Sequence, residues 1–260
     1  MTMAEIPSVL EKVYDNETLR RSIVPLFIGN PGLGKTVLIQ EFAKRKGAKL
    51  VELITSQMSP FEISGIAMPD KESKKMTYFN FDKLEDLKDG DILFFDELLN
   101  GNPVVLNACL TILEQRKFIS GKDLPNIMII AAANPQGMSP LTPQIKERFV
   151  WYSVEFDQEM WVDYMINKYG VTKAIGNKMA RLIKGEEFET SNFFTPRSID
   201  KAVNMLINEV STPYEANIKP ILETTIKNPF KEKVQLPGGR ELAENEMISW
   251  LELIKLKMSA

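Results

Sequence analysis

The chain has 260 residues, with 32 lysines and arginines against 35 aspartates and glutamates, which gives a formal net charge of −3. Apolar residues make up 44% of the chain and charged residues 26%, values that are typical of a globular protein and exclude the collagen-like and disordered classes. The length fits one large domain, or a medium domain with a smaller companion. The slightly acidic balance weakly disfavours general nucleic-acid binding.

Two residue types limit the chemistry. Histidine is absent, and Cys109 is the single cysteine. These counts exclude an internal disulfide, a zinc site built on cysteine or histidine, and a histidine-dependent catalytic triad. We therefore expect any metal to be a hard cation bound by oxygen atoms, and any general base to be a carboxylate.

The sequence has no segment typical of membrane insertion or secretion. No stretch approaches the roughly 20 apolar residues of a membrane-spanning helix, and residues 1–22 lack the apolar core of a secretory signal. Because disulfide chemistry is also absent, we expect a cytoplasmic protein without a membrane partner.

Short apolar runs, separated by helix-length intervals, organise the first part of the chain. They predict strands over residues 26–29, 50–53, 92–95, 127–133 and 149–154. Continuous apolar runs at this spacing are typical of a parallel sheet that is buried on both faces. Asn102 and Pro103 predict the N-cap and first turn of a helix between the third and fourth runs.

Residues Gly29–Thr36, GNPGLGKT, follow the first run and precede a helical pattern. This order and spacing predict a phosphate-binding loop. Its glycines let successive backbone N–H groups surround phosphates, Lys35 adds a positive charge, and the Thr36 hydroxyl can bind Mg²⁺. The predicted nucleotide-binding residues are Gly29, Asn30, Pro31, Gly32, Leu33, Gly34, Lys35, Thr36 and Val37.

The third run ends in two carboxylates, Asp96 and Glu97. Ligands bind at the carboxyl edge of a parallel sheet, so we expect Asp96 to hold Mg²⁺ and Glu97 to polarise the attacking water. The alternative is an acidic pair at a helix start, where the helix dipole favours negative charge. The phosphate-binding loop in the same chain favours the functional interpretation.

Polar residues lie on both sides of the fourth run. Residues 118–126, FISGKDLPN, predict a hairpin with its turn at Ser120 and Gly121. Asn134 follows the run and is predicted to contact the γ-phosphate or the attacking water. The alternative is that Asn134 is only a turn residue before Pro135.

From about Glu155 onward the strand patterns cease, and apolar residues recur at helical spacing. The clearest helix runs from Ile199 to Val210, after Pro196 at an expected first turn. A last helix is predicted from Met247 to Met258, and residues 229–240 are predicted to form a loop. The chain therefore reads as an α/β domain followed by a smaller helical one.

These residues together resemble the AAA+ ATPases, and within them the MoxR-like subfamily, over about residues 25–210. The resemblance places Walker A at Gly29–Thr36, Walker B at residues 94–97, sensor 1 at Asn134, the arginine finger at Arg148 in LTPQIKERF, and the sensor 2 arginine at Arg197 in TPRSIDKAV.

The resemblance implies a three-layer αβα P-loop NTPase domain with a parallel sheet over residues 1–154, followed by a smaller all-helical lid domain over residues 155–260. It also implies an insertion at about residues 60–81 and a pre-sensor hairpin at about residues 117–126. Glu147 departs from the Asp that usually precedes the finger in this family, while Arg148 keeps its place.

The activity implied by the resemblance is Mg²⁺-dependent hydrolysis of ATP to ADP and phosphate. The implied catalytic residues are Glu97, Asn134, Arg148 and Arg197, and the implied Mg²⁺ ligands are Thr36 and Asp96. The family also implies a homo-oligomer in the form of a hexameric ring. Such a ring acts as a chaperone-like remodeller of protein complexes, on a protein client and beside a partner with a von Willebrand A domain.

Two other functions remain open at the level of sequence. Nucleic-acid remodelling motors share these motifs, but the basic and aromatic residues in the hairpin are few, namely Lys117, Phe118 and Lys122. A nucleotide-gated protein-binding module with slow hydrolysis also fits. For Arg148, the alternative to a finger is a surface ion pair with Glu147 or Glu155.

Three further groups of residues have structural interpretations. Met76, Tyr78 and Phe79 in the insertion either grip a substrate or pack onto the domain. Cys109 is expected to be a buried small apolar residue. A basic cluster is expected to face water at a helix end rather than to bind nucleic acid, and it consists of Lys44, Arg45, Lys46 and Lys49.

Overall fold

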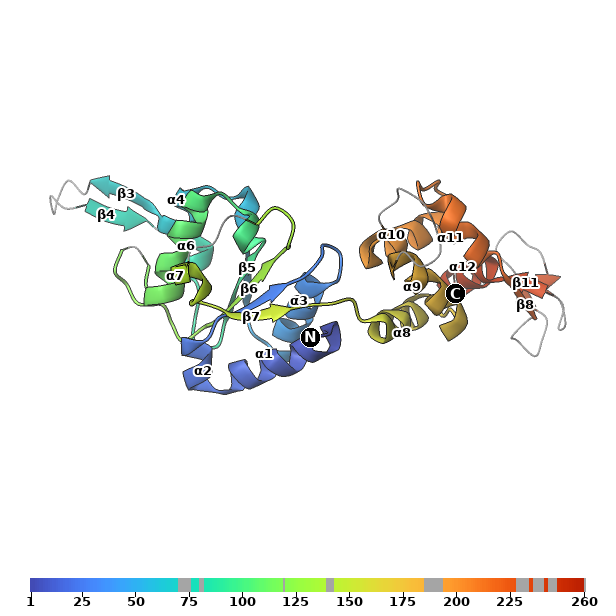
Figure 1. Ribbon diagram of the computed structural model, residues 1–260, viewed down its shortest axis with the longest axis horizontal. Coiled ribbons are helices and arrows are strands. Elements are labelled where there is room, and N and C mark those ends of the chain that lie inside the picture. The colour runs from blue at the N-terminus through green and yellow to red at the C-terminus, as the bar shows by residue number, and fades with distance from the viewer. Residues whose placement is uncertain are drawn as a thin grey trace. The chain divides into compact units, whose positions relative to one another are not determined.

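The computed structural model describes residues 1–69, 76–79, 82–118, 120–138, 143–184, 194–227, 234–235, 241–242 and 247–259. The chain divides into two compact units, Met1–Phe156 and Asp157–Ala260 (Figure 1). The N-terminal unit contains a parallel sheet, and the C-terminal unit consists mainly of helices.

The N-terminal unit is built on a five-stranded sheet in the order β2-β5-β6-β1-β7. All neighbouring strands in it are parallel. The strands are β1 (Pro25–Ile28), β2 (Leu50–Ile54), β5 (Ile92–Asp96), β6 (Met128–Ala133) and β7 (Val150–Ser153). Their positions agree with the apolar runs, so the predicted parallel sheet is confirmed.

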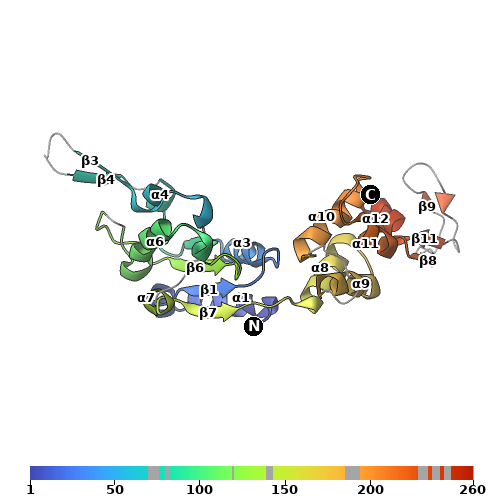
Figure 2. The ribbon, with the colours of Figure 1, turned by 45° about the horizontal axis from the view of Figure 1, so that its top comes forward.

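Helices cover both faces of this sheet, which gives three layers (Figures 1 and 2). One face carries α1 (Ile6–Asp15) and α3 (Lys35–Lys46), and the other carries α4 (Pro60–Ser64) and α6 (Pro103–Gln115). The shorter elements of the unit are η1 (Met3–Glu5), α2 (Glu17–Ser22), η2 (Thr55–Gln57), α5 (Asp82–Glu85), η3 (Leu98–Asn100) and α7 (Pro143–Lys146).

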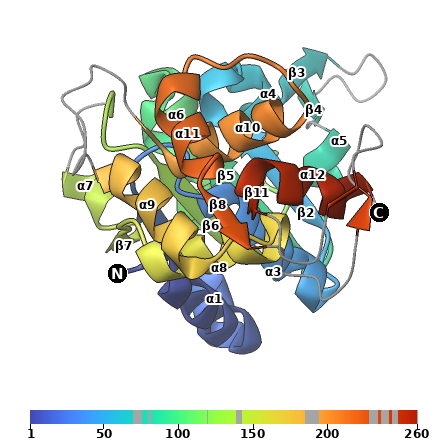
Figure 3. The same cartoon turned by 90° about the vertical axis from the view of Figure 1, so that its right-hand side faces the viewer.

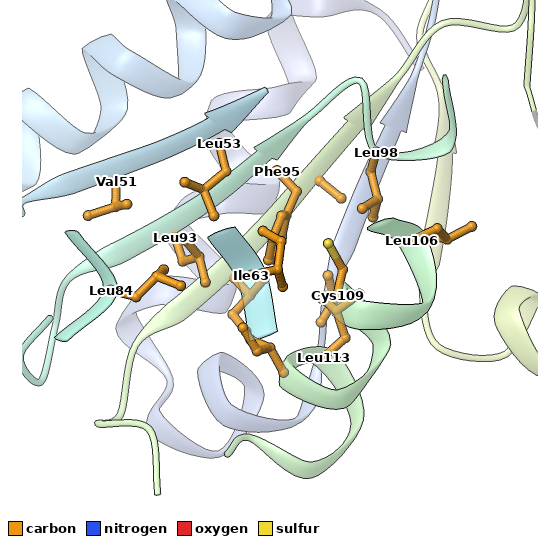
Figure 4. Close-up of a cluster of buried hydrophobic side chains, with 14 of the residues drawn as sticks. Val51, Leu53, Ile63, Leu84, Leu93, Phe95, Leu98, Leu106, Cys109 and Leu113 are labelled. Carbon is orange, nitrogen blue, oxygen red and sulfur yellow. The ribbon is translucent and has the colours of Figure 1, made fainter. Parts of the chain in front are cut away.

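The central strands are buried on both sides. Leu93 and Phe95 of β5 belong to a buried cluster that includes Cys109 of α6 (Figure 4). Because side chains alternate along a strand, Ile92 and Phe94 face the opposite layer, and both are also fully buried. Burial on both faces explains why β5 reads as a continuous apolar run rather than as an alternating one.

The helix α6 begins where the sequence predicts. The side chain of Asn102 accepts a hydrogen bond from the Val104 N–H at 2.9 Å, and Pro103 occupies the first turn. This N-cap satisfies one of the N–H groups that the start of a helix leaves without a partner.

Part of the predicted insertion forms an antiparallel hairpin of β3 (Ile66–Pro69) and β4 (Met76–Phe79). Figure 2 shows this hairpin extending away from the rest of the N-terminal unit. Met76, Tyr78 and Phe79 are all exposed, so the alternative in which they pack onto the domain is wrong. Residues 70–75, 80 and 81 of the predicted insertion lie outside the described residues.

The chain turns back on itself after α6. Arg116 ends the helix in the left-handed region, with φ of 53°. Lys117 and Asp123 form an antiparallel bridge, and the Phe118 N–H donates to the Lys122 carbonyl at 2.9 Å. Gly121 lies in the turn with φ of 84°, a backbone conformation that strains other residues. Residue 119 lies outside the described residues.

The C-terminal unit combines helices with short antiparallel strand pairs (Figure 3). The helices are α8 (Gln158–Tyr169), α9 (Lys173–Lys184), α10 (Pro196–Ile207), α11 (Glu215–Leu222) and α12 (Trp250–Ser259). The strand pairs are β8 (Thr225–Lys227) with β11 (Met247–Ser249), and β9 (Val234–Gln235) with β10 (Glu241–Leu242).

These strands make the unit mainly, rather than entirely, helical. Strands of two or three residues are too short to produce an alternating sequence pattern, so nothing in the sequence predicted them. β9 falls within residues 229–240, which were predicted to form a loop, and the remainder of that stretch lies outside the described residues.

The last helix begins later than predicted. Met247–Ser249 pair with β8 as β11, and α12 begins at Trp250. The Ser249 N–H donates to Glu252 Oε2 and the Glu252 N–H donates to Ser249 Oγ, both at 3.2 Å. Such reciprocal capping starts a helix directly after the serine. The predicted start at Met247 is therefore wrong.

The helix α10 is fixed against α8 by a polar contact. Asp200 accepts hydrogen bonds from Lys168 Nζ at 2.8 Å and from the Tyr169 hydroxyl at 2.9 Å. Burial alone lowers the pKa of Lys168, but its hydrogen bonds to Asp200 and Tyr164 outweigh burial and raise that pKa above its usual value. The apolar face of α10 is buried through Ile199, Ala202, Val203, Leu206 and Ile207. The helix ends at Ile207, so the predicted end at Val210 is wrong, and Val210 is exposed.

Burial of Cys109 can be tested by its reactivity. Burial raises the pKa of this thiol to about 12. At pH 8 only about one thiol in 10⁴ is then ionised, so we expect the native protein to resist Ellman's reagent. In denaturant the thiol is solvated and should react fully within minutes. Rapid absorbance change with the native protein under the same conditions would contradict the burial.

Candidate functional site

The predicted phosphate-binding loop joins β1 to α3. β1 ends at Ile28 and α3 begins at Lys35, so the loop leads directly into the start of a helix. Gly32 and Gly34 have φ of 80° and 105°, which L side chains rarely adopt. A Cβ on Gly29 would lie 2.6 Å from the Val154 carbonyl oxygen, so only glycine fits. Backbone N–H groups and the positive end of a helix dipole thus meet at the sheet edge.

The ammonium group of Lys35 lies over this loop. Lys35 is only 7% exposed, and its Nζ donates to the Gly29 carbonyl at 2.6 Å and to the Asn30 carbonyl at 3.1 Å. Asn134 Oδ1 lies 3.5 Å from the same nitrogen. A buried positive charge therefore lies beside the backbone that is predicted to surround phosphates.

Thr36 and Asp96 lie side by side at the ends of α3 and β5. Thr36 Oγ1 donates to Asp96 Oδ2 at 2.8 Å. Adjacent ligands of an octahedral Mg²⁺ ion are about 2.9 Å apart, so these two oxygens fit neighbouring positions around one ion. Within the described residues no cluster of three or more acids and cysteines could hold a metal. Phosphate and water oxygens are therefore needed for the other positions.

Asp96 and Glu97 point in different directions. The Glu97 N–H donates to Asp96 Oδ1 at 2.9 Å, whereas Glu97 Oε2 accepts a hydrogen bond from the Ser56 hydroxyl, beyond the end of β2. Glu97 has φ of 55°, in the left-handed region that only a few per cent of non-glycine residues adopt. The two carboxylates thus have separate partners, and it is Asp96 that accepts the hydrogen bond from Thr36.

Asn134 follows β6, the strand next to β5. Its N–H donates to Asn100 Oδ1 at 2.9 Å, and its carbonyl accepts from Asn100 Nδ2 at 3.2 Å. The structure therefore brings the predicted residue beside Lys35 on one side and beside the loop that carries Glu97 on the other. Neither Asn100 nor Ser56 was predicted. Asn100 offers one sequence signal, an amide directly after an apolar pair that follows Glu97.

Arg148 lies beyond α7, at the surface of the N-terminal unit. Its side chain is 42% exposed, and its Nε pairs with Glu114 Oε1 of α6 at 2.8 Å. In the described part of the chain its ion-pair partner is thus neither Glu147 nor Glu155, the two acids suggested by the sequence. The acid that pairs with Arg148 therefore lies on α6 and is not one of the predicted site residues around Lys35.

Arg197 belongs to the C-terminal unit. It lies in the first turn of α10, where Thr195 accepts a hydrogen bond from the Ser198 N–H at 3.0 Å, and its side chain is exposed. A cation in a first turn gains nothing from the helix dipole. Among the described helices of both units, none has the length and apolar character needed to cross a membrane.

Related sequences match part of this chain. A family model described as an AAA domain of the dynein-related subfamily matches residues 25–149. Two uncharacterised proteins of Methanocaldococcus jannaschii, MJ0079 and MJ0812, are each 30% identical over 149 residues, which is 57% of this chain and 37% of theirs. The chain therefore spans little more than a third of the length of these relatives.

Solved structures share the fold. The RuvB Holliday junction branch migration motor of Thermotoga maritima is 15% identical, with a TM-score of 0.54 over 85% of this chain and 70% of that one. A mutant of the same RuvB gives a TM-score of 0.56 at the same identity and coverage. Residues 25–149, which carry the loop, the acid pair and Asn134, match the AAA domain model, and the chain shares the fold of the RuvB structures.

Proposed function

We propose that this chain is a Mg²⁺-dependent ATP hydrolase that works as an oligomer and remodels protein complexes. The observation that carries the proposal is the meeting of Lys35, the Thr36–Asp96 pair and Asn134 at one edge of the sheet, with Glu97 directly after Asp96. A buried cation, a magnesium-ligand pair and a second acid that does not bind the metal are the groups that phosphoryl transfer to water needs.

In this proposal the Gly29–Gly34 loop binds the phosphates through its backbone N–H groups, and Lys35 turns its ammonium from the loop carbonyls to the phosphate oxygens. Thr36 and Asp96 hold Mg²⁺, which when bound offsets the negative charge of the phosphates. Asn134 donates an N–H of its side-chain amide to the γ-phosphate or to the attacking water.

Glu97 is the proposed base. It orients the attacking water and takes its proton while the bond between the γ-phosphorus and the bridging oxygen breaks, and ADP leaves with that oxygen. Ser56 donates to Oε2 of Glu97, and a carboxylate with two oxygens can accept a hydrogen bond from water at the same time. The absence of histidine from the chain supports a carboxylate in this role.

Arg148 is proposed to complete the site of a neighbouring subunit. Its exposure supports an action outside its own chain, for which it has to leave Glu114. A group that acts in this way requires a head-to-tail interface that closes into a ring, for which the MoxR-like resemblance implies a hexamer. Arg197 is proposed as the residue of the C-terminal unit that responds to nucleotide.

The proposed substrate is a protein client, with a von Willebrand A domain protein as partner, as the MoxR-like resemblance implies. A nucleic-acid motor is the second candidate, and stimulation of hydrolysis by DNA would favour it. The basic cluster at and after the end of α3 gives it little support, because three of its four cations pair with acids of the same chain: Arg45 with Glu11, Lys46 with Asp15 and Lys49 with Asp86.

The metal site predicts a Mg²⁺-specific defect. In Asp96→Ala we expect the affinity for Mg·ATP to fall at least about 10-fold, because one metal ligand is lost. Without Mg²⁺ the affinity for ATP should be unchanged or slightly higher, because a negative charge near the phosphates is removed. Fluorescence titration with a labelled ATP analogue, with Mg²⁺ and with EDTA, measures both.

Asp91→Asn is the matched control for this experiment. Asp96 is the last residue of β5, and Asp91 directly precedes the first residue of that strand. The carboxylate of Asp91 accepts hydrogen bonds from the backbone N–H groups of Lys49 and Lys88. In the control, the ratio of the ATP affinities with and without Mg²⁺ should equal that of the unmodified chain. If this ratio is also unchanged in Asp96→Ala, Asp96 does not hold the metal.

A mixing experiment tests Arg148 in trans. Alone, Glu97→Gln should lower kcat by about 10²- to 10⁴-fold, and Arg148→Ala by about 10³-fold or more. An equal mixture should regain activity, because about a quarter of the sites then combine an intact Glu97 with an intact Arg148 from the next subunit. ATPase rate and solution mass with Mg·ATP are measured together.

Arg45→Ala is the control for this mixture, since Arg45 is also an exposed arginine paired with an acid at 2.8 Å. It should hydrolyse ATP as the unmodified chain does. A mixture no more active than its two components, in a preparation that does assemble, would mean that Arg148 does not act across subunits. A monomer under every condition would remove the ring itself.

A further inference from the structure

The side chain of Asn100 makes three hydrogen bonds to the segment that carries Asn134. Asn100 Oδ1 accepts from the Asn134 N–H at 2.9 Å, and Asn100 Nδ2 donates to the carbonyls of Asn134 at 3.2 Å and of Gln136 at 2.8 Å. An asparagine amide has one oxygen acceptor and two N–H donors, and all of these groups are used here.

Asn100 is itself fixed to the loop that carries Glu97. It is the last residue of η3, and its own N–H donates to the Glu97 carbonyl at 2.9 Å. Leu98 and Leu99, which precede it, are fully buried in the core. A Cβ on Gly101 would lie 3.0 Å from the Thr55 carbonyl, so the chain is also closely packed on the far side of Asn100.

Glu97 and Asn134 follow two neighbouring strands, and no strand hydrogen bond continues beyond the ends of β5 and β6 to hold them in register. We propose that Asn100 is a positioning residue that sets Asn134 relative to Glu97, so that hydrolysis depends on Asn100 whereas nucleotide binding does not. The inference rests on the proposed ATP hydrolysis.

Only an amide of this length satisfies both halves of the contact. Aspartate in place of Asn100 keeps the acceptor for the Asn134 N–H, but it loses both donors and turns a negative charge toward two carbonyl oxygens. Alanine removes all three bonds. Both substitutions therefore release the segment after β6. Lys35 keeps its hydrogen bonds to the loop carbonyls, and Thr36 keeps its hydrogen bond to Asp96.

The test compares turnover with binding. In Asn100→Ala and Asn100→Asp we expect kcat to fall about 10- to 100-fold, because small displacements of catalytic groups have effects of this size. The Kd for Mg·ATP should stay within about twofold of the unmodified chain. Equal losses in kcat and in affinity would overturn the proposal, since they would mean that the whole site is disturbed.

Asn102→Ala is the matched control. Asn102 is the same residue type two positions away, and it makes one hydrogen bond that caps α6. The control should lower Tm but leave kcat unchanged. If it lowers kcat as much as Asn100→Ala does, general destabilisation explains the effect and the proposal fails.

Two further measurements separate this proposal from the proposed function. In an Asn134→Ala background, Asn100→Ala should add little to the loss of kcat, because both changes remove the contribution of the Asn134 side chain to hydrolysis. A full additional loss would mean that Asn100 acts elsewhere.

Hydrogen exchange at the backbone N–H of Asn134 can be measured without turnover, and it should become faster in Asn100→Ala. Unchanged exchange would overturn the proposal, whereas absent ATPase activity of the unmodified chain, with faster exchange in the variant, would overturn only the proposed function.

Discussion

The parallel pairing of β1, β5 and β6 is the constraint on which the candidate site depends. Parallel strands end at the same edge of a sheet, and the register pairs Ile28 with Ala133 and Phe95 with Ala131. The residue after each strand therefore emerges close to the others. The close approach of Gly29 to the Val154 carbonyl keeps the first of these loops against the sheet. Lys35, Asp96 and Asn134 meet because the strands that precede them are in register.

Elements with strong local signals could be predicted from the sequence. The sheet has continuous apolar runs because its central strands are buried on both faces, and Asn102 with Pro103 marks the start of α6. The short strands of the C-terminal unit have no such signal. The start of α12 was misjudged because Met247 and Ile248 continue the helical spacing, while the capping pair of Ser249 and Glu252 decides where the helix begins.

The candidate site shows the same division. Glycines, a lysine and adjacent acids at strand ends were visible because their chemistry requires a fixed spacing. Ser56 and Asn100 were not, because each acts through a hydrogen bond to a segment distant in the sequence. For the same reason the partner of Arg148 could not be chosen from neighbouring acids, since Glu114 lies on α6.

The left-handed backbone of Glu97 has a consequence for the evolution of this fold. A non-glycine residue with φ of 55° is held there by its surroundings, at a cost on the order of 1–3 kcal/mol. Glycine at this position would relax the backbone and stabilise the unit while removing the carboxylate. Selection for stability alone would thus act against the acid, and the role proposed for Glu97 in hydrolysis would then set activity against stability at this position.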